Sequence, residues 1–272
     1  YIIGRQKTTE IGESGMVKFE RQSIIEQELT SQGFILIPAM SALLQCSEET
    51  IRRDLKEMEK AGKLTRTHGG AYLIEKYDKS YPTALRQTYM HRAKGKMAHL
   101  AMQHIRENDV IMLDSSTTCL ALAEALAQSK MNLTIITNSL PICNLCNDSN
   151  TNINLICIGG TFRRRTSSFT DYHTIDVLAT YHADRTVISC PKVTREFGLS
   201  DNHLSESRVR EWMIKRADSS YLIVDHTKSN GNANILFGGI QEINTIITDQ
   251  QLSAEWEAFA EKSGIKIEYC AD

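Results

Sequence analysis

The segment Ser47–Gly70, SEETIRRDLKEMEKAGKLTRTHGG, decides how the first part of this 272-residue chain folds. The hydroxyl of Ser47 can cap a helix N-terminus, and the glutamates after it suit the positive end of the helix dipole. Apolar residues then recur at the i, i+4 and i+7 spacing of one helix face: Ile51, Leu55 and Met58. The segment therefore predicts an amphipathic helix that ends at Gly62, a residue suited to a left-handed conformation.

The opposite face of this predicted helix is mainly cationic. At about 100° per residue it presents Glu49, Arg53, Lys56 and Lys60, with Arg52 at its edge. Two short strands are predicted around the turn at His68–Gly70, in residues 64–67 and 71–73. A capped helix with a cationic face, followed by a hairpin, is the arrangement with which a winged helix–turn–helix reads DNA.

The residues upstream complete a three-helix unit. A first amphipathic helix that ends near Gly33 is indicated by apolar residues at helical spacing: Phe19, Ile24, Ile25 and Leu29. A second, short helix with Pro38 in its opening turn is indicated by Ile37, Met40, Leu43 and Leu44. The third helix is then free to enter a DNA major groove, which is about 12 Å wide.

The ordinary alternative for the cationic face is a solvated helix surface, but the basic residues are unevenly placed. Six of the eight in residues 16–74 lie between Arg52 and Arg66. We therefore expect Arg53 and Lys56 to face the major groove, Arg52 to lie nearer a phosphate and Thr50 to lie at the groove edge. The full set expected to contact DNA is Ser47, Glu49, Thr50, Arg52, Arg53, Lys56, Lys63, Arg66 and His68.

Two segments in this region resemble the N-terminal domain of the DeoR-type family of bacterial repressors of sugar metabolism. They are TIRRDL at residues 50–55 and the R-x-HGGA pattern at residues 66–71. Ala39, Ser41 and Cys46 depart from the family pattern as packing variants. The resemblance implies a DNA-binding regulator whose partner is double-stranded operator DNA. It also implies a homo-oligomer, a dimer or tetramer, since one winged helix reads too few bases to be specific.

Composition is that of a globular protein without general attraction to nucleic acid. The chain is 41% apolar and 24% charged, with a formal net charge of −2, so DNA affinity must come from a local patch. No apolar run reaches the roughly 18 residues of a membrane span, and seven cysteines without a regular pattern fit reduced thiols in cytoplasm. Cys143 and Cys146 form one close pair, for which packing on a helix is favoured over zinc or redox chemistry.

Four segments are predicted along the chain. Residues 1–15 carry no periodic pattern and are expected to be an extension outside the folded domains. Residues 16–74 form the winged helix–turn–helix domain. Residues 75–90 are expected to be a linker, because they lack clear periodicity and Tyr81-Pro82 disfavours helix. Residues 91–272 form a second domain.

Short apolar runs alternate with helical patterns in this second domain. Runs are present at residues 110–113, 133–136, 155–158, 186–188, 221–224 and 245–247. Helical patterns are present at residues 92–107, 118–128, 139–147, 172–181, 203–217 and 253–263. This alternation predicts an α/β domain with a parallel sheet buried on both faces. Ligands bind such sheets outside the carboxyl ends of the strands.

Several loops at those strand ends carry polar residues that suit a small phosphorylated ligand. Asp114–Thr118 leads from a strand into a helix, Thr137–Ser139 ends the next strand, and Gly159–Thr161 precedes three arginines. Asp225–Lys228 ends a later strand and offers a lysine. Taken singly, each of these residues has an ordinary explanation as a cap or a turn. The sequence contains neither a dinucleotide glycine fingerprint nor a phosphate loop, so no cofactor is predicted.

The same loops resemble the effector domain of the DeoR-type family. Matching residues are Asp114, Thr117, Thr118, Asn138, Gly159, Gly160, Gly198, Glu206, Asp225 and Lys228. Departures from the family pattern are Ser116, Cys190-Pro191-Lys192 and Arg210. The resemblance implies a fold like that of ribose-5-phosphate isomerase and a phosphorylated sugar as effector.

The expected effector-binding set is Asp114, Ser115, Ser116, Thr117, Thr118, Asn138, Gly160, Arg163, Gly198, Glu206 and Lys228. Thr117, Thr118 and Lys228 are expected to hold the phosphate. Sugar hydroxyls are expected to contact Asp114, Asn138 and Glu206. An alternative is a sugar-phosphate isomerase with an accessory DNA-binding domain, for which Asp114, Glu206 or Asp225 would supply the base. The intact recognition helix favours a regulator, with no catalytic residue and no metal site.

Overall fold

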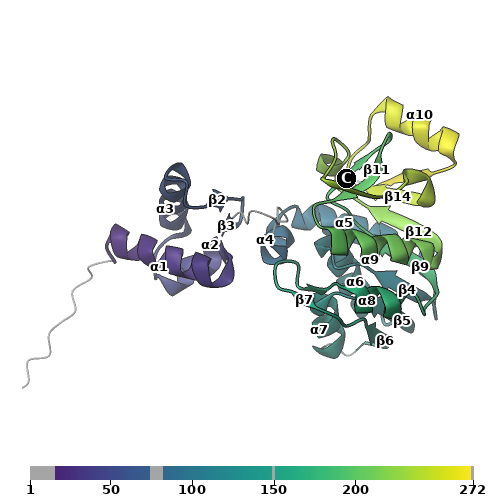
Figure 1. Cartoon of the computed structure of the whole chain (residues 1–272), viewed down its shortest axis with the longest axis horizontal. Coiled ribbons are helices and arrows are strands. Elements are labelled where there is room, and N and C mark those ends of the chain that lie inside the picture. The colour runs from purple at the N-terminus through teal and green to yellow at the C-terminus, as the bar shows by residue number, and fades with distance from the viewer. Residues whose placement is uncertain (1–15, 74–81, 149–150, 271–272) are drawn as a thin grey trace, which may run out of the picture. The chain divides into compact units, whose positions relative to one another are not determined.

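The computed structural model describes residues 16–73, 82–148 and 151–270 (Figure 1). The chain divides into two compact units, residues 1–74 and residues 75–272, which are described separately here. The expected extension at residues 1–15 lies outside the described residues.

The first unit is a three-helix domain with a small antiparallel sheet. Its elements are α1 (Lys18–Gln32), β1 (Phe34–Leu36), α2 (Ile37–Leu43), α3 (Glu48–Lys60), β2 (Thr65–Arg66) and β3 (Gly70–Tyr72). The strand order is β1-β3-β2. The three predicted helices and the hairpin are therefore confirmed, and β1 is an addition. Three residues are too few to show the alternation by which a strand is recognised in sequence.

Local signals set the limits of α3. The Ser47 hydroxyl accepts a hydrogen bond from the Thr50 N–H at 3.2 Å, so the predicted N-cap is confirmed. The helix ends at Lys60, and Gly62 follows it with a φ of +72°. The apolar side of α3 packs in a core with α1 and α2 whose fully buried members include Ile25, Leu29, Ile51 and Leu55. Phe19 and Leu43 share the predicted apolar spacing but are 83% and 57% exposed.

A buried ion pair ties α1 to α3. The Arg21 guanidinium donates to both carboxylate oxygens of Asp54, from Nε and from a terminal nitrogen, the latter at 3.2 Å. Arg21 also donates to the Met16 carbonyl at 2.9 Å. Asp54 is buried, and its bond to Arg21 raises the pKa of the guanidinium. This pair fixes how the apolar side of α3 faces α1, and so where the opposite side points.

The second unit is built on a seven-stranded parallel sheet with strand order β15-β14-β12-β9-β4-β5-β6. Its strands are β4 (Val110–Leu113), β5 (Leu133–Thr137), β6 (Ile153–Cys157), β9 (Ala183–Ile188), β12 (Ala217–Ile223), β14 (Thr245–Thr248) and β15 (Lys266–Tyr269). Its main helices are α5 (His91–Met102), α6 (Thr117–Ser129), α7 (Leu140–Asp148), α8 (Tyr172–Leu178), α9 (Leu204–Lys215) and α10 (Ala254–Ser263). The predicted α/β fold is confirmed.

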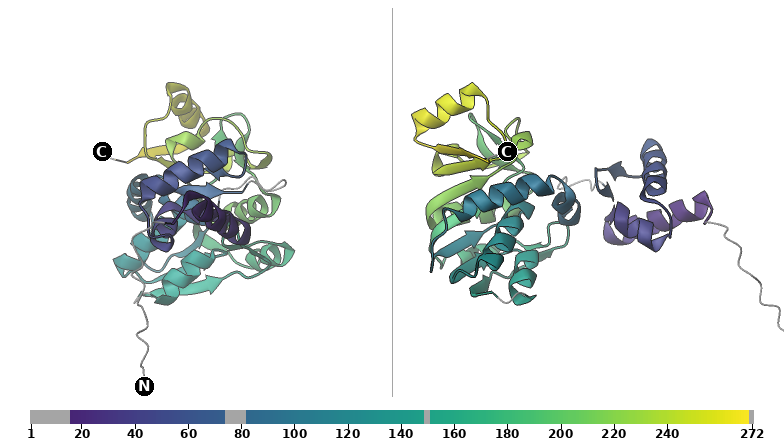
Figure 2. Two further views of the ribbon diagram at one scale, coloured as in Figure 1. Left: turned by 90° about the vertical axis from the view of Figure 1, so that its left-hand side faces the viewer. Right: turned by 180° about the vertical axis from the view of Figure 1, so that it is seen from behind.

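Helices cover both faces of the sheet (Figure 2). On β4, Ile111 and Leu113 pack into a core that includes residues of α5, α6 and α7. Met112, between them, packs into a second core that includes residues of α8, α9 and α10. This alternation explains why β4 reads as a continuous apolar run, because both of its faces are buried.

Smaller elements were not predicted. They are the hairpin of β7 (Phe162–Arg163) and β8 (Ser168–Phe169), the antiparallel sheet of β10 (Lys192–Thr194), β11 (Gly198–Asp201) and β13 (Ile235–Gly238), and the 3-10 turns η1 (His226–Lys228) and η2 (Ile240–Glu242). Residues 75–81 of the expected linker lie outside the described residues, and its later part contains a helix that was not predicted, α4 (Thr83–Thr88). Pro82 precedes this helix as its N-cap, and a proline disfavours helix only at the residue before it, so the helix after it is unaffected. No helix in the described ranges is long and apolar enough to cross a membrane.

Candidate functional site

Two regions concentrate the polar residues singled out by the sequence, and the first is the exposed side of α3. Arg53 and Lys56 are exposed, and neither makes a hydrogen bond or salt bridge with another described residue. Arg52 is exposed but bonded, with its terminal nitrogens 2.6 Å from a Glu48 carboxylate oxygen and 3.9 Å from one of Glu49. Arg53, Lys56 and Lys60 are therefore the α3 cations without an ion pair among the described residues. The charge of Arg53 nevertheless acts on Glu57, whose pKa is lowered mainly by Lys18 and in part by Arg53.

The hairpin behind α3 carries three further predicted residues. Lys63 pairs with Glu26 at 2.7 Å, and Arg66 pairs with Glu59 at the same distance. Glu59 also accepts the Arg66 backbone N–H at 2.9 Å, so it holds the hairpin against α3. His68 is exposed at the turn. The two cations here are already bonded to glutamates and would have to leave them to reach a phosphate.

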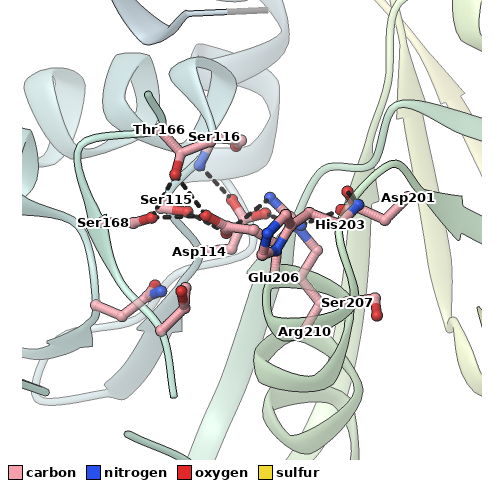
Figure 3. A network of polar contacts seen from close by, with 12 residues as sticks. Asp114, Ser115, Ser116, Thr166, Ser168, Asp201, His203, Glu206, Ser207 and Arg210 are labelled. Carbon is pink, nitrogen blue, oxygen red and sulfur yellow. Dashed lines mark hydrogen bonds and ion pairs between the residues drawn. The ribbon is translucent and has the colours of Figure 1, made fainter. Parts of the chain in front are cut away.

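The second region is a network of buried charges at the carboxyl end of β4 (Figure 3). Asp114 is 1% exposed and accepts three hydrogen bonds. They come from the Ser116 N–H at 3.0 Å, the Ser189 N–H at 3.3 Å and Nε of Arg210 at 2.6 Å. Asp114 thus joins the start of α6 to the end of β9 and to α9.

Glu206 lies in the first turn of α9 and is 2% exposed. Its carboxylate accepts hydrogen bonds from the hydroxyls of Ser115 at 3.0 Å and of Thr166 and Ser168 at 2.6 Å. Arg163 donates to it at 3.2 Å. Burial alone would raise the pKa of Glu206, but the Arg210 charge and these hydrogen bonds lower it to about 2. The carboxylate is therefore ionised at neutral pH.

Arg210, one helical turn after Glu206, is the cation that the network shares. It bonds to Asp114 and to Asp201 and lies 3.8 Å from Glu206. Burial would lower the pKa of Arg210, but Asp201, Asp114 and Glu206 together raise it. The sequence marks Arg210 only as a departure from a family pattern, because its partners are separated from it by 9 and 96 positions.

Lys228 lies beside this network on η1. Its Nζ is 3.2 Å from the Ser189 hydroxyl and 3.7 Å from an Asp225 carboxylate oxygen. Ser189 also donates its backbone N–H to Asp114, so Lys228 and Asp114 share a neighbour. At the start of α6, Ser116 caps the helix by accepting the Cys119 N–H at 3.0 Å. Thr117 and Thr118 follow it and are buried.

Two basic residues near the network have no place in the expected set. Arg86, on α4, is half-buried and lies within electrostatic range of Arg210, Glu206, Asp114 and Asp201. Lys94, on α5, is 4% exposed, and its Nζ donates to the carbonyls of Arg86 and Tyr89. Burial and the positive charges of Lys228 and Arg86 lower the pKa of Lys94 to about 7. Helical periodicity cannot predict buried basic residues such as Lys94, because it assigns charged residues to the exposed face of a helix.

Asn138 directly follows β5 and is 1% exposed. Its side-chain nitrogen donates to the Phe169 carbonyl at 2.9 Å, but its Oδ1 has no hydrogen-bond partner among the described residues. An unpaired buried amide oxygen costs free energy. A ligand hydroxyl would satisfy it.

The two glycines of the expected set have structural roles in the chain. Gly160 has a φ of +139°, and a Cβ there would lie 2.1 Å from the Thr174 hydroxyl oxygen. Gly198 has a φ of +70°, and its Cβ would lie 2.3 Å from the Gly238 carbonyl oxygen. Both positions exclude a side chain, and this accounts for glycine at each without a ligand contact.

Metal ligation and thiol chemistry find little support. In the part of the chain that the structure describes, no three His, Cys, Asp or Glu side chains are placed to share a metal ion. Cys143 and Cys146 both lie on α7, as predicted, and burial raises the pKa of each thiol. A raised pKa keeps a thiol protonated and less reactive.

Each of the two units matches a known family of domains. Residues 21–77 match the DeoR-like helix-turn-helix domain, and residues 90–250 match the DeoR C terminal sensor domain. The chain is 32% identical over 239 residues to the L-fucose operon activator of Escherichia coli, with 86% of this chain and 96% of that protein covered. It is 29% identical over 256 residues to the HTH-type transcriptional regulator IolR of Bacillus subtilis, with 92% and 99% covered.

Among solved structures, ribose 5-phosphate isomerase A from Methanocaldococcus jannaschii is similar to part of the chain. The TM-score is 0.38 at 14% identity, with 52% of this chain and 55% of that chain covered. A likeness of this size carries no conclusion about ligand or activity. The two domain matches and the long alignments are sufficient without it: the chain belongs to the DeoR family of DNA-binding transcriptional regulators.

Proposed function

We propose that this protein represses a carbohydrate-utilisation operon by binding operator DNA through α3 and the hairpin, and that a phosphorylated sugar bound in the α/β unit controls it. The observation that carries the ligand class is a set of basic groups without full partners at the carboxyl ends of the strands. Arg163, Arg210 and Lys228 pair with carboxylates. Arg86, by contrast, has an Nε without a hydrogen-bond partner among the described residues, and the charged form of Lys94 is disfavoured by burial and by the charges of Lys228 and Arg86. An anion would bond to Arg86 and favour the charged form of Lys94.

The remaining polar groups suit the sugar part of such a ligand. Asn138 offers an unpaired amide oxygen, and Ser115, Thr166 and Ser168 offer hydroxyls that Glu206 now orders. Asp114 and Glu206 are bonded to arginines and to protein donors rather than left open. Their expected contacts with sugar hydroxyls therefore require an exchange of partners.

The isomerase alternative is disfavoured by the same geometry. A general base for proton transfer between carbons needs a pKa near the working pH. The pKa of Glu206 is lowered to about 2, and Asp114 accepts three hydrogen bonds. A regulator needs no such base, and the proposal assigns no catalytic residue, metal or cofactor.

The proposal includes a homo-oligomer that works in the cytoplasm. One α3 can read only a few base pairs, whereas two copies related by a two-fold axis would read paired half-sites about 34–36 Å apart. Light scattering coupled to gel filtration would measure the oligomeric state. A strictly monomeric protein on its operator would contradict this part of the proposal.

A binding experiment tests the whole proposal. A duplex selected by the protein from a random-sequence pool would be labelled, and fluorescence anisotropy would report its affinity at physiological salt. Phosphorylated hexoses, pentoses and trioses would then be added beside their unphosphorylated parents. We expect one phosphorylated sugar to change DNA affinity at least tenfold and its parent to have no effect. Equal responses to both, or turnover of a sugar phosphate by the protein, would overturn the assignment.

A further inference from the structure

Arg86 lies on α4, the first helix of the α/β unit. Helix α4 begins at Thr83, and residues 74–81 lead to it from the DNA-binding unit. Its side chain nevertheless lies in the electrostatic field of the carboxylate network of the α/β unit. The first helix of the α/β unit therefore carries a cation that acts on the charged site.

The surroundings of Arg86 are incomplete without an anion. Its Nε is enclosed by protein and has no hydrogen-bond partner among the described residues. A terminal nitrogen donates to the Thr83 hydroxyl at 2.9 Å, within the same helix. Burial and the nearby guanidinium of Arg210 lower the pKa of Arg86. A half-buried guanidinium whose Nε is enclosed and unpaired, near a second guanidinium, is stabilised by an oxyanion, which accepts its N–H groups in pairs.

Helix α4 is held in the α/β unit by its buried residues Thr83 and Leu85 and by a few hydrogen bonds. The Thr83 N–H donates to the Arg165 carbonyl at 2.9 Å. At the other end of the helix, Lys94 donates to the Arg86 carbonyl and to the Tyr89 carbonyl, the latter at 2.7 Å. Lys94 is therefore a positioning residue for α4, and Lys228 is the cation nearest to it in electrostatic effect. Anything that bonds Arg86 from the site would add a contact to this six-residue helix.

Building on the effector site proposed above, we propose that Arg86 binds the anionic group of the effector, so that occupancy of the site fixes α4. Arg86 and Lys228 would contact the anion, and Lys94 would hold the helix that carries Arg86. Ligand binding would thereby stabilise α4, which is the first helix of the α/β unit in the sequence. This ligand contact is distinct from the α6 N-terminus expected from sequence, where Ser116 already caps one N–H.

A thermal-shift titration of the full chain with inorganic phosphate tests the contact. Sodium chloride would keep the ionic strength constant, and sodium acetate would separate a phosphate requirement from a general anion effect. Phosphate should raise the melting temperature of the wild type, because binding to the folded state alone stabilises it. Arg86→Gln should weaken the phosphate affinity roughly ten- to a hundredfold, the size of a lost charge-assisted bond.

Two variants make the result specific. Arg86→Lys keeps a positive charge and should retain more phosphate affinity than Arg86→Gln. Arg92→Gln removes an exposed arginine from the start of α5 and should bind phosphate like the wild type. Wild-type affinity in Arg86→Gln would overturn the inference and leave the proposed function standing. Absence of any phosphate effect on the wild type would overturn both.

Hydrogen exchange measures the second half of the inference. Phosphate should slow amide exchange in peptides that cover residues 83–89 of the wild type by severalfold, and should leave the same peptides of Arg86→Gln unchanged. Peptides from α10 serve as an internal reference, since that helix packs elsewhere in the unit. Equal exchange at residues 83–89 with and without phosphate would show that α4 does not respond to the site.

Discussion

The cations expected to contact DNA and the cation shared by the strand-end network are held in opposite ways. In the DNA-binding unit, the side chains of Arg52, Lys63 and Arg66 are 46%, 49% and 36% exposed, and each pairs with one or two glutamates. In the α/β unit, Arg210 is 6% exposed and faces three carboxylates. Exposed pairs contribute little to stability and are screened by salt, whereas a buried group left without its partner is costly. The first set can therefore exchange glutamates for phosphates, while the second fixes the shape of a site.

Arg210→Met should have the largest effect among tests of this contrast. Asp114, Asp201 and Glu206 would lose a shared cation, so the free energy of unfolding should fall by about 3–5 kcal/mol. Both tryptophans of the chain, Trp212 and Trp256, lie in the α/β unit, so urea unfolding followed by tryptophan fluorescence reports on that unit. Arg208→Met is the matched control, since Arg208 is exposed on the same helix and its ion pair with Glu211 lies at the surface. Its cost should stay below about 1 kcal/mol, and equal losses in the two variants would contradict the comparison.

Lys94 should make the stability of the α/β unit depend on pH. Its pKa is lowered to about 7 in the folded protein and would return to about 10.5 on unfolding. Between these values the unfolded chain binds more protons, so the free energy of unfolding should rise with pH, by an amount on the order of a few kcal/mol. Lys228 and Arg86, and Asp225 with opposite sign, are the charges that act on it.

Urea unfolding at pH 7 and at pH 9.5 would measure this dependence. Lys94→Met keeps most of the apolar stem and should remove the Lys94 contribution, leaving a flatter profile. Lys96→Met, at an exposed position of α5, should keep the wild-type slope. A wild-type slope in Lys94→Met would mean that Lys94 is charged in the folded protein at pH 9.5.

Arg53→Ala tests the exposed side of the contrast. Loss of a bidentate guanine contact should weaken binding to the selected duplex by roughly 1–3 kcal/mol and relax specificity at one base pair. Arg52→Ala should have a smaller effect that is equal on selected and random duplexes, because Glu48 already balances part of its charge. Fluorescence anisotropy at physiological salt measures both. Full affinity in Arg53→Ala would exclude it from the recognition surface.

The smallest effect is expected at the hairpin. In a Lys63→Ala, Arg66→Ala variant, the slope of log affinity against log salt should become shallower by less than the roughly 1.8 expected for two phosphate contacts. The reason is that Glu26 and Glu59 compete with DNA for these cations. An unchanged slope would leave the hairpin as packing against α3. A change as large as 1.8 would show that both ion pairs open fully on DNA.

Most of the fold could be predicted from local signals. Contacts between residues far apart in the sequence could not be predicted in this way. The cap at Ser47 and the apolar runs of β4 and β5 depend on neighbours within a few residues, so pattern alone finds them. Helix α4 was missed because six residues after a proline show too little periodicity. Asp114 was singled out as a residue at the carboxyl end of a strand and Glu206 through the family resemblance, and Arg210 links the two in one network. Arg86 and Lys94 could not be foreseen, since their importance comes from charges that only the fold brings near.

Gly160 has a consequence for how this sequence can change over evolutionary time. The space that its missing side chain leaves is filled by Thr174 and Asp171, which form a capping box at the start of α8. Any residue with a Cβ at position 160 would displace that box. Positions 160, 171 and 174 should therefore change together in evolution. In homologous chains, a side chain at position 160 should occur only where the residues at positions 171 and 174 have also been replaced. A homologue that keeps the box beside a larger residue would show that the loop after β6 can take a different path.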